Sequence, residues 1–151
     1  MNATRRFEIL PGYREAGIAL PRRATPASAG YDLACAETAV IAPGAVGLVP
    51  TGVRAWIPAG EFLEIHIRSS VALRRGLVLA NGTGVIDSDY AGNPENGGHI
   101  LLALRNLGSE PARLERGERV AQGIFLRYLT TDDDRPGAPR SGGFGSTGAR
   151  A

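Results

Sequence analysis

The chain has 151 residues, enough for one domain with a single core, and its 17 basic residues nearly balance 15 acidic ones. The balance and the lack of a basic stripe argue against a nucleic-acid partner, and no apolar run is long enough for a membrane span. Every basic residue is an arginine, so guanidinium groups are left to bind any phosphate. Because Cys35 is the only cysteine, no intrachain disulfide forms, and a cytoplasmic location is expected.

Glycine and proline interrupt the chain at short intervals and helical periodicity is nearly absent, which predicts an all-β fold. One short helix is expected, at residues 70–75, where Ser69 or Ser70 could act as the cap. The expected strands cover residues 7–9, 31–34, 38–41, 45–50, 53–56, 61–67, 77–79, 84–86, 99–106, 112–114 and 121–128.

The C-terminal part differs in composition from the rest. Residues 130–141 contain three consecutive aspartates and two prolines, with nothing to bury. We therefore expect a β domain over residues 1–131 and a flexible linker and Gly-rich arm over residues 132–151. This linker should let the arm reach away from its own core.

The arm itself has the chemistry of a phosphate-binding segment. Residues 142–148 hold four glycines, Phe144, Ser146 and Thr147, and Arg140 precedes them. Backbone amides, hydroxyls and a guanidinium suit phosphate oxygens, and an aromatic ring can stack on a base. The alternative is a frayed terminus without function.

Two carboxylates follow the apolar residues 84–86. Asp87 and Asp89 would point to the same side of an extended strand, where one could act as a general base on a water molecule. Tyr90 comes directly after them. The alternative is a polar hairpin turn, with Tyr90 in the core or at its rim.

Three further segments carry polar groups. Arg68, Ser69 and Ser70 precede the predicted helix and could bind an anion there, or could simply cap the helix. Asn81, followed by a glycine, reads first as a hairpin turn and second as an amide facing a base edge. Gln122 is polar among apolar residues and either satisfies buried backbone or faces a ligand. His66 and His99 are expected to be structural.

Taken together and in order, five segments resemble the motifs of the trimeric dUTP pyrophosphatases (dUTPases) over nearly the whole chain. Each is weak alone, but five in this order and spacing are specific. They lie at residues 29–33, 68–70, 81–90, 117–122 and 140–148.

The resemblance implies a distorted jelly-roll of the β-clip type. It also implies a homotrimer whose active sites lie between subunits, with the arm of one chain closing over a site built by the other two. The implied reaction is hydrolysis of dUTP to dUMP and pyrophosphate, with water attacking the α-phosphorus. Mg²⁺ would be carried by the triphosphate, and Asp32 would reach it only through water.

The resemblance also implies a role for individual residues. Asp87 activates the water, Tyr90 packs under the deoxyribose, and Phe144 stacks on uracil. The uracil edge is read by Asn81, Gly84 and Val85. The phosphate chain is held by Arg68, Ser69, Ser70 and Gln122, and by Arg140, Gly145, Ser146 and Thr147 of the arm.

The chain departs from many family members in two places. Residues 91–99 form a longer hairpin tip after the third motif, and Arg140 lies one residue nearer the glycines. The nearest rival is the dCTP deaminase family, which shares the fold, but Ala103 stands where its catalytic glutamate would be. A non-catalytic nucleotide-binding protein would be expected to have lost Asp87 or the arm.

Overall fold

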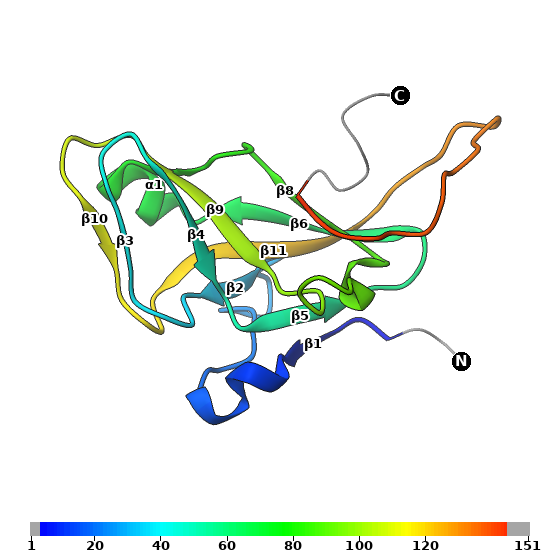
Figure 1. Ribbon diagram of the computed structural model, residues 1–151, viewed down its shortest axis with the longest axis horizontal. Helices are drawn as coiled ribbons and strands as arrows, with labels where there is room; N and C mark the ends of the chain where they lie inside the picture. Colours follow the sequence, from blue (N-terminus) through cyan, green and yellow to red (C-terminus); the bar gives the residue numbers. More distant parts are fainter. Residues whose placement is uncertain (1–3, 145–151) are drawn as a thin grey trace.

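The structure, a computed structural model, describes residues 4–144 as an all-β fold with one short α-helix (Figure 1). The strands are β1 (Arg6–Ile9), β2 (Tyr31–Ala34), β3 (Ala39–Ile41), β4 (Val46–Pro50), β5 (Val53–Trp56), β6 (Glu61–Ile67), β7 (Leu77–Leu79), β8 (Gly84–Asp87), β9 (Leu101–Asn106), β10 (Ala112–Leu114) and β11 (Arg119–Arg127). The helix is α1 (Ser69–Arg75), and two short 3-10 segments are η1 (Pro11–Ala16) and η2 (Tyr90–Gly92).

The predicted strands are confirmed, with ends that shift by no more than two residues. The helix begins at Ser69, one residue earlier than predicted. Its N-cap is Arg68, which is extended and makes no side-chain capping bond, so Ser69 and Ser70 lie inside the first turn and do not cap the helix. The 3-10 segments η1 and η2 were not expected, because single turns of this kind have no periodicity to detect.

Two antiparallel sheets build the body of the domain. One has the strand order β2-β11-β6-β8 and the other β4-β9-β7, while β1-β5 and β10-β3 form two-stranded ribbons. Neighbours such as β2 and β11 are far apart in sequence, so the chain crosses over between strands as in jelly-roll folds.

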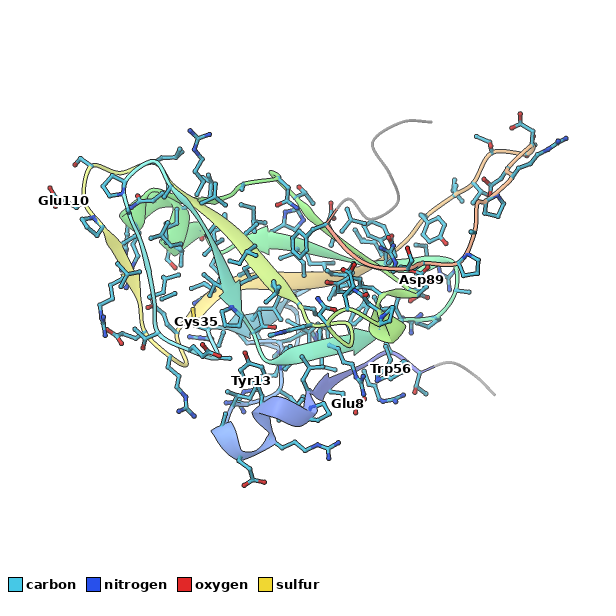
Figure 2. All side chains as sticks on the ribbon, viewed as in Figure 1. Glu8, Tyr13, Cys35, Trp56, Asp89 and Glu110 are labelled. Atoms are coloured by element: carbon cyan, nitrogen blue, oxygen red, sulfur yellow. The ribbon has the colours of Figure 1, made fainter. Side chains whose placement is uncertain are left out.

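The core lies between the two sheets. Alternate residues of β6 and β9 point inward, among them Leu63, Leu102 and Leu104, which are almost completely buried. Burial of each such leucine stabilises the fold by about 1.5–3 kcal/mol. Cys35 also lies inside (Figure 2), and burial raises the pKa of its thiol to about 11.

The segment after β11 loops out from the sheet and then returns (Figure 1). On its return, Arg140 pairs with Asp87 and Asp89, and the Gly143 N–H donates to Glu95. The linker therefore leaves the core as expected, but residues 140–144 lie on their own chain, which the sequence did not predict. The proposed domain boundary between residues 131 and 132 stays a prediction.

Candidate functional site

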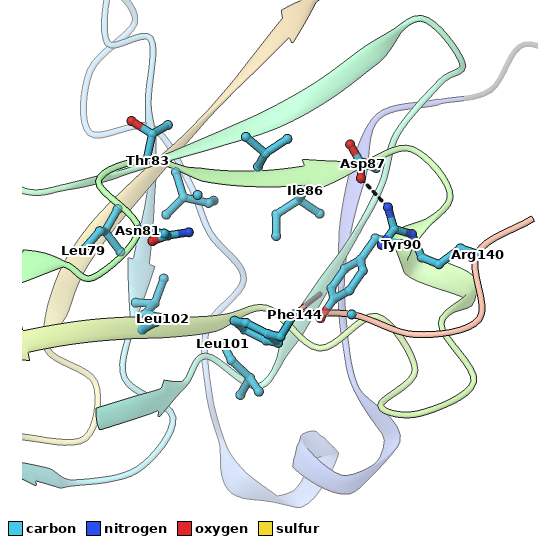
Figure 3. A pocket seen from close by; sticks show the side chains of 15 residues that line it. Leu79, Asn81, Thr83, Ile86, Asp87, Tyr90, Leu101, Leu102, Arg140 and Phe144 are labelled. Atoms are coloured by element: carbon cyan, nitrogen blue, oxygen red, sulfur yellow. Dashed lines mark hydrogen bonds and ion pairs between the residues drawn. The ribbon is translucent and has the colours of Figure 1, made fainter. Parts of the chain in front are cut away.

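A cavity of about 300 Å³ opens between β8, β9 and the returning arm (Figure 3). Its wall combines apolar side chains of the core with a few polar groups. Among the residues that line it are Asn81, Gly84, Val85, Asp87, Tyr90, Ala103, Arg140 and Phe144. An apolar pocket with a few convergent polar groups is the usual form of a small-molecule site.

The base of the cavity is set by the pairing of β8 with β6. Gly84 lies opposite Ile65, and a Cβ at Gly84 would meet the Ile65 Cβ at 2.9 Å. Glycine is therefore needed for the two strands to approach, and it leaves the backbone of Gly84 open to the cavity. The turn that precedes β8 has Gly82 in the left-handed region, with φ at 75°, and presents Asn81 to the cavity.

Two carboxylates stand at the end of β8. Asp87 is its last residue, and Asp89 precedes η2; both side chains are about half exposed. The Arg140 guanidinium joins them, with its Nε donating to Asp89 Oδ1 at 2.7 Å and its Nη2 donating to Asp87. The bond to Asp89 raises the pKa of Arg140. Both carboxylates contact Arg140, but not through strand alternation: β8 ends at Asp87, and Asp89 lies in a turn with helical backbone angles.

Tyr90 is a fixed, nearly buried platform beside these carboxylates. Only 7% of it is exposed, and its hydroxyl donates to the His99 carbonyl at 3.2 Å and accepts from Asn96 Nδ2 at 3.0 Å. The Arg140 guanidinium lies 5.7 Å from the centre of its ring, a cation–π contact. The ring is thus held at its hydroxyl end and covered by the arm.

The arm closes the cavity. A Cβ at Gly143 would meet Tyr90 Cε2 at 3.0 Å, so this glycine permits the close approach of the arm to the ring. Phe144 follows at a positive φ of 46° and lies at the edge of the cavity (Figure 3). Of the predicted site residues, Gly145, Ser146 and Thr147 lie outside the described residues.

A second cluster collects the other predicted phosphate ligands. Asp32 accepts from Arg119 Nη1 at 2.8 Å and lies 3.5 Å from Arg68 Nε. Gln122 is opposite Asp32 in the pairing of β11 with β2, and its side chain covers Gly30, where a Cβ would collide with it. Ser69 and Ser70 are exposed beside this cluster at the start of α1.

The two clusters lie at opposite ends of β6. Asp87 pairs with Phe62 near the start of this strand, and Arg68 follows its last residue. Arg68 is six residues further along the chain than Phe62, which is about 20 Å at the usual rise per residue of a strand. The structure therefore unites the third and fifth motifs, and separately the first, second and fourth, but it does not bring the two sets together within one chain.

No group of three or more His, Cys, Asp or Glu side chains within residues 4–144 could hold a metal ion. Asp32 is occupied by two arginines, which does not suit a direct metal ligand. Among the described residues, no helix is long and apolar enough to cross a membrane.

Some contacts of the site carry no sequence signal. Glu95, Asn96 and His99 all contact the arm or the Tyr90 hydroxyl, yet they sit in a tip rich in turn residues. Only the glycines at 97 and 98, both with positive φ, could have indicated a tightly folded loop there. His66 lies 3.3 Å from Glu64, and His99 accepts a backbone bond from Gly52; that both histidines are structural stays a prediction.

Comparisons with known proteins agree on one family. The family profile described as dUTPase matches residues 16–148. The deoxyuridine 5'-triphosphate nucleotidohydrolase of Lactococcus lactis is 49% identical over 147 residues, covering 96% of this chain and 98% of its own. The enzyme of that name from Desulfitobacterium hafniense is 44% identical over 138 residues, covering 85% and 87%.

Solved structures give the same result. The crystal structure of dUTPase from Streptococcus mutans superimposes with a TM-score of 0.80 at 46% identity, covering 84% of this chain and 98% of that one. The G164S mutant of a Staphylococcus bacteriophage 80alpha dUTPase, solved with dUpNHpp, gives a TM-score of 0.70 at 25% identity and covers 99% of this chain and all of that one.

Proposed function

The chain belongs to the dUTPase family, and on that premise we propose that it hydrolyses dUTP to dUMP and pyrophosphate by attack of water on the α-phosphorus. The observation that carries this proposal is the cavity whose lining brings Asn81, Tyr90, Asp87 and Phe144 together (Figure 3). The amide of Asn81 suits a base edge, the ring of Tyr90 suits a sugar, and the carboxylate of Asp87 suits a reacting water. In the cell, this reaction would limit uracil incorporation into DNA and supply dUMP for thymidylate synthesis.

Asp87 is the proposed general base. It accepts a proton from water as the water oxygen forms a bond to the α-phosphorus; the bond from that phosphorus to the bridging oxygen breaks, and pyrophosphate leaves. Because Asp87 is about half exposed at the end of a strand, water can reach it. Its contact with Arg140 must be exchanged for contact with that water, and the triphosphate offers Arg140 a stronger partner.

The nucleoside half of the substrate is assigned to the cavity. The uracil edge would bond to Asn81 and to the backbone of Gly84 and Val85, where the close pairing with β6 leaves little room for a methyl group. Tyr90 would pack under the deoxyribose and clash with a ribose 2′-hydroxyl. Phe144 would stack on the base, which contributes about 1–3 kcal/mol.

The phosphate half needs a second copy of the chain. Along β6, Arg68 lies about 20 Å from Phe62, the partner of Asp87 in β8. Ser69 and Ser70 follow Arg68 on α1, and Gln122 pairs with His66 toward the same end of the sheet, away from Asp87. We therefore assign them to the site of a neighbouring subunit in a homotrimer, with the arm residues Arg140, Gly145, Ser146 and Thr147 closing on the phosphates. Exchange of the arm between subunits, with the arm of one chain closing over a site built by the other two, stays a prediction.

The substrate is proposed to be the magnesium complex of dUTP. Phosphate oxygens are ligands that Mg²⁺ prefers, and the ion would arrive and leave with them. Asp32, which is paired with Arg68 and Arg119, would contact it only through water. The proposed location of the enzyme is the cytoplasm, where the nucleotide pool and a reduced Cys35 agree with the composition of the chain.

One assay tests the function and its nearest rival. Pyrophosphate release is measured with dUTP, dCTP, dTTP and UTP at equal concentrations, and ammonia release with dCTP. We expect turnover of dUTP alone. Ala103 lines the cavity and its methyl group cannot move a proton, so no deamination of dCTP is expected. Pyrophosphate release from UTP at a specificity constant comparable to that for dUTP would contradict the proposal.

A further inference from the structure

The hairpin tip at residues 93–99, which follows η2, is folded as a closed hydrogen-bonded loop. Asn93 Nδ2 donates to Asn96 Oδ1 at 3.0 Å, and the Gly98 N–H donates to the same oxygen at 3.0 Å. The Glu95 N–H donates to Asn93 Oδ1 at 3.0 Å, and Asn93 is 2% exposed. A loop with this many internal bonds is specified in detail, which is more than a simple connection between β8 and β9 requires.

The loop is also packed tightly against the platform residue. Gly98 has a φ of 82°, and a Cβ there would meet the Ala91 Cα at 2.5 Å and the Tyr90 carbonyl oxygen at 2.7 Å. On its far side, His99 Nε2 accepts from the Gly52 N–H at 2.9 Å, and the His99 ring lies edge-on to Tyr13 at 5.2 Å. The tip is thus wedged between Tyr90 and the turn that joins β4 to β5.

The outcome of this packing is a fixed position for one atom, the Tyr90 hydroxyl. It accepts from Asn96 Nδ2 at 3.0 Å and donates to the His99 carbonyl at 3.2 Å. With one donor and one acceptor both engaged, the ring can neither slide along its plane nor tilt without breaking a bond in a nearly buried place.

We propose that Asn96 is a positioning residue for sugar selectivity. Its amide holds the Tyr90 ring in a fixed position against the sugar, where a deoxyribose fits and the 2′-hydroxyl of a ribose does not. The inference rests on the proposed function, which places the sugar on Tyr90. A clash with a 2′-hydroxyl discriminates only if the ring cannot retreat, because a loosely held ring would move to make room. Selectivity therefore depends on the rigidity of the ring as well as on its presence.

Asn96→Asp is the test variant. It keeps the Oδ1 atom that accepts from Asn93 and Gly98 but removes the donor to Tyr90, whose single O–H cannot serve both the new carboxylate and His99. We expect the ratio of kcat/KM for dUTP to that for UTP to fall on the order of tenfold, mainly because UTP becomes a better substrate.

Asn106→Asp is the matched control. Asn106 is also a loop-closing asparagine, and it is fully buried: its Nδ2 donates to the carbonyls of Ile41 and Glu110, and its Oδ1 accepts from the Gly108 N–H. It is the last residue of β9 and does not line the cavity. The same chemical change there should lower Tm and leave the dUTP-to-UTP ratio unchanged.

A double-mutant cycle with Tyr90→Phe decides whether Asn96 acts through the hydroxyl. Tyr90→Phe alone should lower the ratio to a similar extent, and Asn96→Asp should lower it no further in that background. An unchanged ratio in Asn96→Asp, or an equal further loss in the Tyr90→Phe background, would overturn the proposal. A wild-type protein that fails to release pyrophosphate from dUTP would instead overturn the proposed function, so the two failures are distinguishable.

Discussion

The two ends of β6 carry opposite chemistry. At one end, Asp87 and Asp89 gather beside Tyr90; at the other, Arg68 and Arg119 surround Asp32. Each end is neutralised by a group of the opposite sign, but the source of that group differs. Arg140 comes from the arm after a long linker, whereas Asp32 is part of β2.

This difference indicates which end must open. Exposed ion pairs contribute only about 0–1 kcal/mol each, so the contacts of Arg140 with the half-exposed Asp87 and Asp89 can be exchanged readily for contacts with substrate. Asp32 and Arg119 lie on the neighbouring strands β2 and β11, so the sheet itself places these two charges side by side. We therefore expect the carboxylate end to change on binding and the arginine end to stay preformed.

The strongest way to separate the two ends is to remove the proposed base. Asp87→Asn keeps the size of the side chain but cannot accept a proton from water. Turnover of dUTP should fall by about two to four orders of magnitude while binding is largely kept. Steady-state kinetics and calorimetry with a non-hydrolysable analogue measure the two effects. Asp89→Asn, which also loses a carboxylate on Arg140, should lose less; near-normal turnover in Asp87→Asn would remove Asp87 from the mechanism.

Truncation after Arg135 acts on the carboxylate end alone. It removes Arg140 and Phe144 but no residue of a strand or of the core. Folding, assembly and Tm should be nearly unchanged, and kcat/KM should fall on the order of a hundredfold because the reacting geometry is less well held and water is less well excluded. Protease sensitivity of the intact arm should drop when the analogue is bound. If truncation leaves activity intact, the arm is a frayed terminus.

Mixing two inactive variants tests whether the two ends meet only between subunits. Asp87→Asn lacks the base, and Arg68→Ala lacks a phosphate ligand. If each site takes one end from each of two chains, random assembly of an equal mixture gives about a quarter of the sites both wild-type ends. Activity should recover to about that fraction after co-refolding, in an assembly of three times the 15.8 kDa chain mass. No recovery would mean that one chain holds a complete site.

Most of the fold and many site residues could be predicted from sequence because their signals are local. Glycine and proline turns bound short apolar segments such as residues 61–67, which predicts strands. Asp87 could be predicted because it stands directly after the apolar residues of β8. The second contacts of those residues could not be predicted. The contact of Arg140 with Asp87 depends on how a segment distant in sequence folds back. Asn96 is only six residues from Tyr90, but the sequence of a polar loop does not show which group each side chain bonds.

The smallest effect concerns His99, a half-buried residue that anchors the tip at the carboxylate end. His99 Nε2 accepts from the Gly52 N–H, and the titratable groups that face it are Tyr13 and Glu37. Burial lowers the pKa of His99 below its usual value of 6.5, while Glu37 opposes this shift. Because the folded state takes up this proton less readily than the unfolded state, stability should be lost as pH falls below about 6.5, until the pKa of the folded state is reached.

His99→Gln provides the comparison for this prediction. A glutamine oxygen can accept the same bond from Gly52 but does not titrate, so the decline of Tm between pH 8 and pH 5 should be shallower than in the wild type. Calorimetric scans of both proteins across that range measure the difference. When His99 is protonated, its Nε2–H and the Gly52 N–H would be two donors facing each other. Because the His99 carbonyl accepts from the Tyr90 hydroxyl, selectivity for dUTP over UTP should also weaken in the wild type over the same pH range. Parallel Tm curves for the two proteins would show that acid does not act on the carboxylate end through His99.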